Sequence, residues 1–535
     1  MPEMPVSEKE NNVKGGLEDY EREDSGRYPF LLNYRECKLL GIAGVGFFLD
    51  AYDLFIINPV ATMLQYRLYN GAPIPSGIQG FLKASANIGS VIGQFGFGYA
   101  ADTFGRKAVY GKELMIIIFA TILCISDPTG DLSATGSVLW LSIWRIILGI
   151  GIGGDYPMSA SVATERANLR RRGTLLSYIF ANQGWGSLVG SLMVIIVLAC
   201  YHNVMEVKGE TSKVDGVWRI LVGLSLIPAF GTLYQRLTLP ESKRFKASQK
   251  GAEAETDSID ELKKKADADP GVQESVRPAA ASGTPTPTAL SPAPSAAAPA
   301  QPKREHWAEF LHYFSEWRHF RVLLGTCACW FLLDVAFYGI NLNQNVVLEE
   351  IGFDGSSGSA WTRLFKIGIG NLIVTALGFV PGYYVTILTI EWLGRKWIQI
   401  QGFLLAALFL GILAGKFYTL GTVGFIVNFA FLQFFFNFGA NATTYCYPAE
   451  VFPTKFRASA HGISAACGKA GAIISALVFN SLTESIGTPN VLWIFFGCCI
   501  AGAGFTLLLP EVRDRDPDLV YAEELREEER NRRGT

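Results

Sequence analysis

The sequence predicts an all-α membrane protein whose twelve transmembrane helices form two pseudo-symmetric six-helix bundles. Long apolar stretches and an internal repeat predict this class, and the composition agrees with them. Of the 535 residues, 50 % are hydrophobic and only 18 % are charged, whereas soluble chains carry roughly a quarter charged residues. The formal net charge is −2, whereas nucleic-acid-binding proteins carry an excess of basic residues, so no nucleic acid is expected as a partner.

Twelve apolar stretches are long enough to cross a bilayer core, which needs about 20 helical residues. Lysine and arginine are concentrated in the loops on the side of the N-terminus, which places both termini in the cytoplasm. The polar, acidic N-terminus does not resemble a signal peptide. The stretches lie at residues 39–64, 79–101, 110–126, 138–163, 174–200, 218–239, 320–348, 364–391, 397–415, 422–448, 458–481 and 491–509.

Polar segments divide the chain into five expected parts. The middle of the central polar segment, Pro278–Pro302, is low-complexity and cannot bury enough apolar surface to fold. The expected parts are a cytoplasmic tail (1–38), a first bundle (39–240), a partly disordered cytoplasmic linker (241–319), a second bundle (320–510) and a cytoplasmic C-terminal tail (511–535).

The two predicted bundles repeat their charged landmarks at a nearly constant offset. Such a repeat of six helices plus six is the plan of secondary transporters that alternate access between two sides of a membrane. The pairs are Asp50 and Asp334 (284 residues apart), Lys83 and Lys366 (283), Glu165 and Glu450 (285), and Gly105-Arg106-Lys107 and Gly394-Arg395-Lys396 (289).

Several motifs resemble those of the major facilitator superfamily. In the second copy of the loop motif, Glu391 stands where the superfamily usually has Asp. The motifs are Gly98-x3-Asp102-x2-Gly105-Arg106-Lys107 after the second stretch, Arg145 with Gly149 in the fourth, and the sugar-porter-like Pro240-Glu241-Ser242 and Pro448-Ala449-Glu450.

A more specific likeness lies in GGDYPMSASVATE (Gly153–Glu165), which resembles the signature of fungal and plant phosphate:proton symporters. The segments Gly46–Asn58, Gly111–Leu114 and Trp330–Gln344 also resemble that family, and the likeness runs from about Gly41 to Pro510 outside the linker. The resemblance implies the major facilitator fold. It also implies proton-coupled import of inorganic phosphate across the plasma membrane by alternating access.

Ionisable side chains within a bilayer span are costly, so each is a functional candidate. Trp330, Asp334 and Tyr338 are spaced by one helical turn and form a polar stripe that must face a cavity. Lys469 lies at a similar depth and would balance charge there. The resemblance adds Tyr156, Gln183 and Asn441 to the expected phosphate site, where neutral donors would bind the anion.

Proton coupling is expected to centre on Asp334, whose protonated form would donate to phosphate and whose ionised form would repel it. Asp50, Asp53 and Asp155 would provide the proton path, with Arg145 holding one of them ionised. A fixed ion pair between Asp53 and Arg145, which locks two helices together, is the alternative interpretation.

Gate salt bridges are expected at the cytoplasmic ends of the helices, where acidic residues lie close to basic loops. The candidates are Asp102, Arg106, Glu113, Glu165, Glu391, Arg395 and Glu450.

The sequence leaves two other functions open: a symporter of glycerophosphodiesters, and a phosphate receptor that signals without much flux. An enzyme is not expected, because no nucleophile–base pair or metal set is visible, and neither is a cofactor or metal site. The expected partners are inorganic phosphate, protons and the lipid bilayer, with arsenate as a competing substrate.

Overall fold

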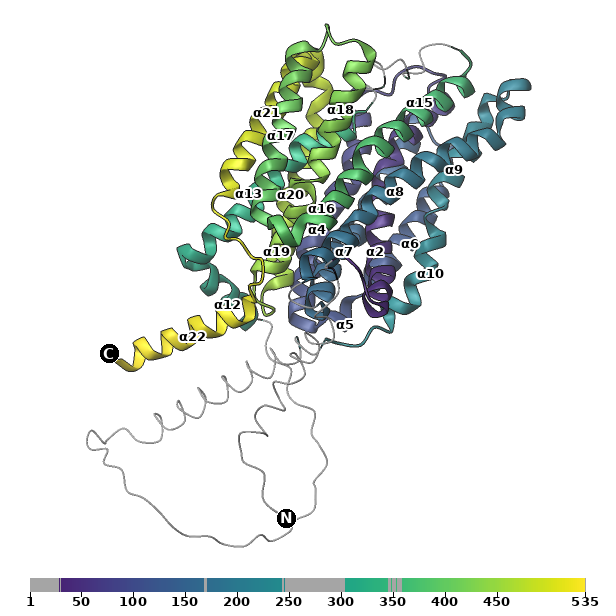
Figure 1. Cartoon of the computed structure of the whole chain (residues 1–535). Helices are drawn as coiled ribbons and strands as arrows, with labels where there is room; N and C mark the ends of the chain where they lie inside the picture. The colour runs from purple at the N-terminus through teal and green to yellow at the C-terminus, as the bar shows by residue number, and fades with distance from the viewer. Residues whose placement is uncertain are drawn as a thin grey trace, which may run out of the picture.

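The computed structural model describes residues 28–534, except 29, 168–170, 243–244, 246–303, 345–347, 349–352 and 354–357. Every regular element in this described part is helical, and the helices stand side by side in one bundle (Figure 1). Most of the predicted tail 1–38 and linker 241–319 lies outside the described residues. The all-α fold class predicted from the sequence is confirmed.

Each predicted stretch overlaps one helix or a run of helical elements that follow end to end, and the stretch 320–348 extends beyond its helix, which ends at Asn341, into residues outside the described part. In the first half these are α2 (Tyr34–Phe55) with α3 (Ile57–Leu68), α4 (Ser76–Phe104), α5 (Arg106–Val109) with α6 (Lys112–Ile125), α7 (Ala134–Arg166), α8 (Arg172–Cys200), and α9 (Val214–Gly223) with α10 (Leu226–Leu237). Two short turns, η2 (Asn203–Val207) and η3 (Thr211–Lys213), connect α8 to α9.

The second half repeats this plan and adds a helix at each end. It comprises α12 (Arg304–Ser315), α13 (Trp317–Asn341), α15 (Ala360–Val374) continued by the π-helical turn η4 (Thr375–Phe379) into α16 (Val380–Leu393), α17 (Arg395–Lys416), α18 (Thr422–Asn437) with α19 (Ala440–Val451), α20 (Arg457–Ile486), α21 (Thr488–Thr506) and α22 (Pro517–Gly534).

Local sequence explains the interruption of the first membrane-crossing helix. Pro59 has no amide hydrogen to donate to the carbonyl of Phe55, so the regular ladder stops and α2 ends at Phe55. The chain continues as α3 after the single residue Ile56, whose φ and ψ of −61° and −21° stay in the helical region. The break lies about one turn beyond Asp53 and about two turns beyond Asp50, so both carboxylates sit in the last two turns of α2.

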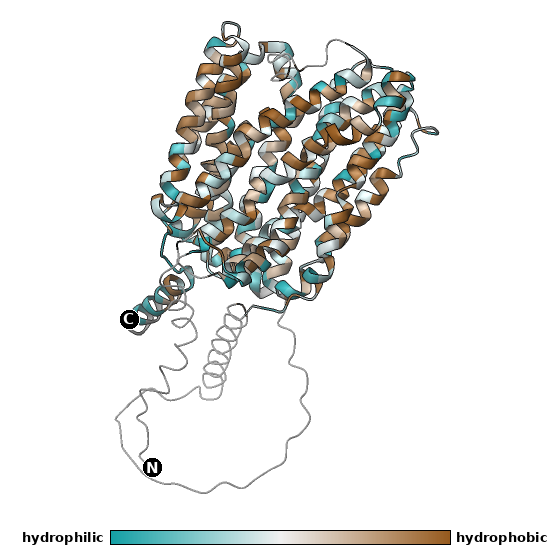
Figure 2. Cartoon of the chain, turned by 45° about the vertical axis from the view of Figure 1, so that its right-hand side comes forward, coloured by the Kyte–Doolittle hydropathy of each residue, from teal (hydrophilic) through white to brown (hydrophobic). Residues whose placement is uncertain are grey.

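Eleven helices of the described part are long and apolar enough to cross a membrane. The twelfth helix, α4, is not among them, although its 29 residues exceed the length that a span requires. Hydrophobic residues predominate along the middle of the helices, and hydrophilic ones are more frequent toward the ends of the bundle (Figure 2). This distribution suits helices that face lipid along their middle.

Glycines let α4 pack directly on its neighbours. A Cβ atom at Gly89 would lie 1.8 Å from the carbonyl oxygen of Ile146 in α7, so the two backbones touch where a side chain would separate them. The same holds between the two halves, because a Cβ atom at Gly462 in α20 would lie 2.3 Å from the carbonyl oxygen of Gln94 in α4. Helix α4 therefore joins α7 within its half and α20 across the halves.

We call the lower end of the bundle in Figure 1 the gate end. It carries α5, α12 and the start of α22, together with the two Gly-Arg-Lys turns at Gly105 and Gly394. Both glycines have a positive φ, of 89° and 79°, which permits the sharp turn between consecutive helices.

Candidate functional site

Side chains from both halves form a buried polar cluster in the middle of the bundle. Every member is at most 4 % exposed. The structure brings together all seven residues that the sequence predicts as substrate-binding, and adds Asp50 and Tyr383. The first half supplies Asp50, Tyr156 and Gln183, and the second half supplies Trp330, Asp334, Tyr338, Tyr383, Asn441 and Lys469.

Asp50 is held by two donors of its own half. The Tyr156 hydroxyl donates to Asp50 Oδ2 over 2.5 Å, and Gln183 Nε2 approaches the same oxygen at 3.1 Å and the Tyr156 oxygen at 2.7 Å. The rings of Tyr156 and Trp330 lie 6.1 Å apart across the two halves. The first-half carboxylate is therefore positioned by α7 and α8.

Tyr383 of α16 connects the amides of the two halves, and sequence reasoning missed it. Its hydroxyl donates to Gln183 Oε1 over 3.3 Å and accepts from Asn441 Nδ2 over 2.8 Å. The only sequence signal was a Tyr-Tyr pair inside an apolar span, and the pattern does not say which ring points inward. In the structure Tyr383 is 1 % exposed and Tyr384 is 38 % exposed.

Asp334 differs from every other member of the cluster. Both of its carboxylate oxygens are buried, and neither accepts a hydrogen bond from any described residue. The Lys469 ammonium donates to the Tyr338 hydroxyl and lies over the rings of Tyr338 (4.3 Å) and Tyr156 (5.1 Å). A buried carboxylate without a donor is costly, so this position favours a proton or a bound ligand with donor groups.

Asp53 and Arg145 are neighbours, but their side chains form no ion pair within the described residues. Arg145 Nη1 donates to the backbone carbonyl of Asp53 over 3.0 Å. Asp53 Oδ2 and two guanidinium nitrogens of Arg145 are buried without hydrogen-bond partners among the residues the structure describes. The backbone contact joins α2 to α7, and the two side chains keep unused hydrogen-bonding capacity.

Asp155 and Glu113 meet around Arg236 of α10, which sequence reasoning missed. Arg236 Nη1 lies 2.7 Å from Asp155 Oδ1 and 3.2 Å from Glu113 Oε1, and all three side chains are at most 3 % exposed. Arg236 also donates to the carbonyl of Ile42 over 3.1 Å. The structure thus places Asp155 and Glu113 in an ion triad inside the first half. A charged residue in the apolar stretch 218–239 was the available signal.

The first of two ion clusters at the gate end is centred on Arg106. Its guanidinium pairs with Asp102 at 3.1 Å and with Glu165 at 2.8 Å, and its Nη2 donates to the carbonyl of Thr454 in the second half over 3.0 Å. Asp102 accepts from the amides of Ala458 (3.3 Å) and Ser459 (2.7 Å) at the N-terminus of α20. A carboxylate at a helix N-terminus is stabilised by the unpaired amides and the helix dipole.

The second ion cluster at the gate end, in the second half, is built on the same plan. Arg395 pairs with Glu391 at 2.7 Å and with Glu450 at 2.6 Å. Glu391 accepts from the amide of Thr174 over 2.9 Å, at the N-terminus of α8 in the first half. Each half therefore places one carboxylate on the first turn of a helix of the other half. These contacts join the two halves at the gate end.

Two further glutamates support the Gly-Arg-Lys turns, and sequence reasoning assigned a role to neither. Glu241 accepts from the amide of Lys107 over 3.0 Å. Glu511 accepts from the amides of Arg395 (3.1 Å) and Lys396 (3.0 Å). The signal was present as a Pro-Glu pair directly after the last helix of each half, at residues 240 and 510.

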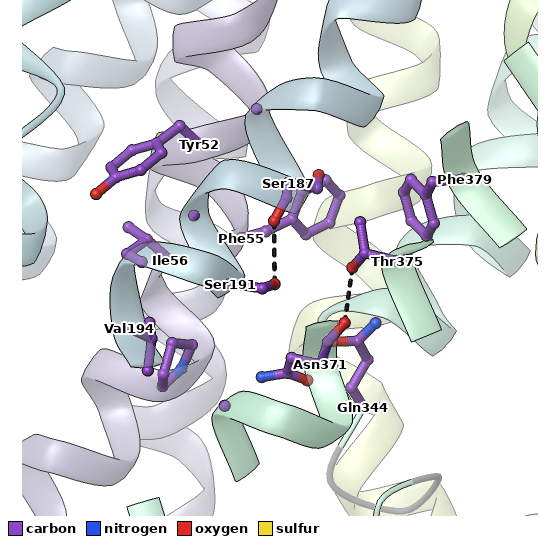
Figure 3. A pocket seen from close by; sticks show the side chains of 14 residues that line it. Tyr52, Phe55, Ile56, Ser187, Ser191, Val194, Gln344, Asn371, Thr375 and Phe379 are labelled. Carbon is purple, nitrogen blue, oxygen red and sulfur yellow. Dashed lines mark hydrogen bonds between the residues drawn. The ribbon is translucent and has the colours of Figure 1, made fainter. Parts of the chain in front are cut away.

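A polar pocket lies between the halves on the side of the central cluster away from the gate end (Figure 3). Ser187 and Ser191 of α8 line one wall, and Asn371 and Thr375 of α15 and η4 line the other. Aromatic rings close its floor: Phe55 lies 6.2 Å from Phe379 and stacks on Tyr338 at 6.1 Å. The central cluster is therefore covered on both sides.

Eleven candidate membrane-crossing helices and the long helix α4, arranged in two similar halves with a covered polar cluster between them, define the secondary-transporter class of membrane proteins. Residues 39–516 match the family model described as "Sugar (and other) transporter". The chain belongs to this family.

Named relatives are similar over almost the whole chain. A Schizosaccharomyces pombe protein named "Putative inorganic phosphate transporter C8E4.01c" is 47 % identical over 93 % of this chain and 90 % of its own. The inorganic phosphate transporter PHO84 of Saccharomyces cerevisiae is 36 % identical, with 90 % and 83 % covered. The repressible high-affinity phosphate permease of Neurospora crassa is 33 % identical, with 91 % and 86 % covered.

Among solved structures, the proton:xylose symporter XylE of the major facilitator superfamily superposes with a TM-score of 0.66 at 20 % identity. The match covers 91 % of this chain and 98 % of XylE. The likeness shows that this chain has the major facilitator fold.

Proposed function

We propose that this protein imports inorganic phosphate together with protons by alternating access. The observation that carries the proposal is Asp334, a buried carboxylate without a donor at the interface of the two halves, beside Lys469. The names of relatives that are 33–47 % identical over at least 90 % of this chain support phosphate as the substrate.

The donors around Asp334 suit a tetrahedral oxyanion that must also be released. Tyr156, Tyr338 and Tyr383 offer hydroxyls, Gln183 and Asn441 offer amides, and Trp330 offers an indole N–H. Lys469 supplies the positive charge. Neutral donors bind phosphate less tightly than a bidentate arginine, and weaker binding favours release on the far side.

Proton coupling follows from charge at Asp334. When ionised, it would repel phosphate in a site with little water to screen the charges. When protonated, it would donate a hydrogen bond to a phosphate oxygen. Phosphate and a proton therefore bind together. When one of them leaves the site, the other is released more easily. Asp50, already held by Tyr156 and Gln183, fixes the opposite wall of the site.

The gate completes the cycle. With the gate end joined by Asp102 and Glu391, substrate enters through the pocket of Figure 3 once the rings of Phe55 and Phe379 separate. Opening the gate end then releases phosphate on the other side. Basic residues lie near both Gly-Arg-Lys turns, so the gate end and both termini are assigned to the cytoplasm. The membrane is assigned as the plasma membrane, and arsenate is expected to compete with phosphate.

Labelled phosphate uptake into proteoliposomes tests the proposal. Uptake should require an inward proton gradient, and Asp334→Asn should abolish it while Asp131→Asn, on an exposed loop residue, should not. An intact protein that accumulates no phosphate under any gradient would contradict the proposal. If excess glycerophosphodiester inhibits phosphate uptake more strongly than excess arsenate does, the result would indicate the diester symporter. Signalling that survives in a transport-dead Asp334→Asn would indicate a receptor.

A further inference from the structure

A second cavity, of about 200 Å3, lies at the gate end, outside the substrate path. We call it the basic cavity. It is enclosed by the end of α12, the start of α13, the α19–α20 connection and the chain that leads into α22. Its lining includes Arg318, His319 and Arg321 from α13, and Arg515 from the segment before α22. Neither the gate nor the substrate site uses these four side chains.

The acidic residues of the basic cavity already have cationic partners. Glu450 accepts from two guanidinium nitrogens of Arg395, at 2.6 and 2.8 Å. Glu524 of α22 lies 3.2 Å from His319 Nε2 and 3.6 Å from Arg318 Nη1. Both lining acids therefore lie within 4.0 Å of other cations, and Arg515 acts on Glu524 only from farther away.

Arg321 and Arg515 are the two cations left over. Both side chains are exposed to solution, and among the described residues neither guanidinium has an ion pair within 4.0 Å or a side-chain hydrogen bond. Two unpaired planar guanidinium groups facing one cavity form a site for an anion that can accept several hydrogen bonds at once. Phosphate groups have this chemistry, whereas a single carboxylate would satisfy only one of the arginines.

Aromatic contacts between α12, α13 and α22 hold one wall of the basic cavity in place. The ring of Tyr313 stacks on His319 with a centroid distance of 3.8 Å, and His319 Nδ1 lies 2.9 Å from the Tyr313 carbonyl oxygen. Tyr521 of α22 packs edge-on against Tyr313 at 5.6 Å. These contacts fix α12 and α22 against α13.

The segment that carries Arg515 is linked to the gate. Asp518, three residues further on, accepts from the amide of Thr454 over 2.6 Å and from its hydroxyl over 2.7 Å. The carbonyl of Thr454 accepts in turn from Arg106 across the halves, over 3.0 Å. A ligand that binds Arg515 and Arg321 together would also stabilise the contacts from Asp518 to Thr454 and from Thr454 to Arg106. It would therefore keep the two halves joined at the gate end.

We propose that the basic cavity binds a phosphate-bearing anion on the gate side, through Arg321 and Arg515, and that its binding slows the opening of the gate. The anion is either a soluble phosphorylated compound or the headgroup of a phosphorylated lipid. Binding does not depend on the proposed transport function, and only the effect on the gate rests on it.

Calorimetric titration of the detergent-solubilised full chain with pyrophosphate tests the soluble source. Nanodiscs that contain phosphatidylinositol phosphate, compared with nanodiscs of neutral lipid, test the lipid source. Arg321→Ala and Arg515→Ala should each weaken binding of the effective probe at least about fivefold. Arg526→Ala, an exposed arginine of α22 outside the cavity lining, should leave binding unchanged, and so should Asp334→Asn.

Equal binding by the wild type, Arg321→Ala and Arg515→Ala, or no binding of either probe, would overturn the proposal. The effect on the gate is measured by phosphate uptake with the effective probe on the gate side, which should slow uptake in the wild type and not in Arg515→Ala. Wild-type uptake that is unchanged while the probe binds would overturn the regulatory half. A protein that shows no uptake but still binds the probe at Arg321 and Arg515 would refute the transport proposal alone.

Discussion

Asp50 and Asp334 occupy equivalent places in the two halves, 284 residues apart, yet their surroundings differ. Asp50 accepts hydrogen bonds from Tyr156 and Gln183, whereas neither oxygen of Asp334 accepts one from the described residues. The halves share a backbone plan, but of these two carboxylates only Asp334 has both oxygens without a donor among the described residues, whereas Asp50 has one. Related positions in a repeat protein can thus divide the work between holding the site and changing its charge.

Substitutions within the repeat explain the difference. At the offset of 285 that relates Glu165 to Glu450, the counterpart of Tyr156 is Asn441. Asn441 donates to Tyr383 and Asn437, and the nearby ammonium of Lys469 donates to Tyr338. The second-half donors are therefore directed away from Asp334. The same offset relates Asp155 to Ala440, so the buried triad around Arg236 has no counterpart in the second half.

The sharpest test of this comparison replaces each carboxylate by its amide. Asp334→Asn removes the group that gains and loses a proton, so proton-driven uptake should fall by about 10²-fold or more. Asp50→Asn keeps an acceptor oxygen for Tyr156, so uptake should fall by about tenfold or less. Phosphate uptake in proteoliposomes at matched protein density measures both. Equal losses in the two variants would contradict the division of roles.

The triad of the first half is expected to matter for stability more than for turnover. Arg236→Ala leaves Asp155 and Glu113 buried without their cation, which typically costs about 3–5 kcal/mol. Thermal unfolding in detergent should show a large loss of stability. The control is Arg363→Ala, which removes a half-buried arginine that donates to the carbonyl of Gly358 at the opposite end of the bundle. An unchanged melting temperature for Arg236→Ala would show that the triad does not hold the first half together.

A smaller effect should distinguish the two ion clusters at the gate end. Asp102→Asn and Glu391→Gln each weaken one carboxylate-to-helix contact, worth about 0.3–1 kcal/mol. Each change should shift the population toward an open gate end by up to about fivefold. Labelling of a cysteine introduced near Thr454 reports gate opening. Asp102 pairs with Arg106, which reaches into the other half, whereas Glu391 pairs with Arg395, which bonds within its own half. Asp102→Asn therefore also disturbs a second contact between the halves, and its cysteine should be labelled faster than that of Glu391→Gln.

A substitution at Asp127 should have the smallest effect on phosphate uptake. It also tests the argument that a buried carboxylate without a hydrogen-bond donor marks the transport site. Asp127 lies in the loop between α6 and α7, is 2 % exposed, and both its oxygens lack hydrogen bonds from the described residues. Burial raises the pKa of Asp127 from 3.8 to about 6, although Arg219 lowers it in part. The native protein then binds this proton more tightly than the unfolded chain does, so stability falls as pH rises between about 4 and 6 and stays lower above that range.

Asp127→Asn should therefore raise the melting temperature at pH 7.5, by a free energy on the order of 1 kcal/mol, and have little effect at pH 4.5. Uptake should change less than twofold, because Asp127 lies outside the substrate path. Loss of uptake in Asp127→Asn would show that an unpartnered carboxylate matters for transport wherever it lies, which would weaken the argument made for Asp334.

Sequence reasoning found the charged members of the site because a charge in an apolar span is rare and costly. It located Asp50, Asp334 and Lys469, and the repeat located the ion pairs of Arg106 and Arg395 at the gate end. It missed Tyr383, because a Tyr-Tyr pair in an apolar helix has no charge to mark the inward ring. It assigned Asp155 and Glu113 to other roles because their shared partner, Arg236, is distant in the sequence. Arg236 lies in α10, four helices after Glu113 in α6 and three after Asp155 in α7. Such pairings depend on how helices rotate about their axes, which one sequence does not specify.

The glycine contact between α4 and α20 has a thermodynamic consequence. Where Gly98 faces Ala458 and Gly462 faces Gln94, backbone meets backbone and few apolar side chains are covered. Separating these helices therefore exposes little apolar surface, and the heat-capacity change of gate opening should be small. The equilibrium between the closed and open gate should then follow a nearly straight van 't Hoff line with temperature. It should respond to salt instead, because charges and helix dipoles hold the closed state.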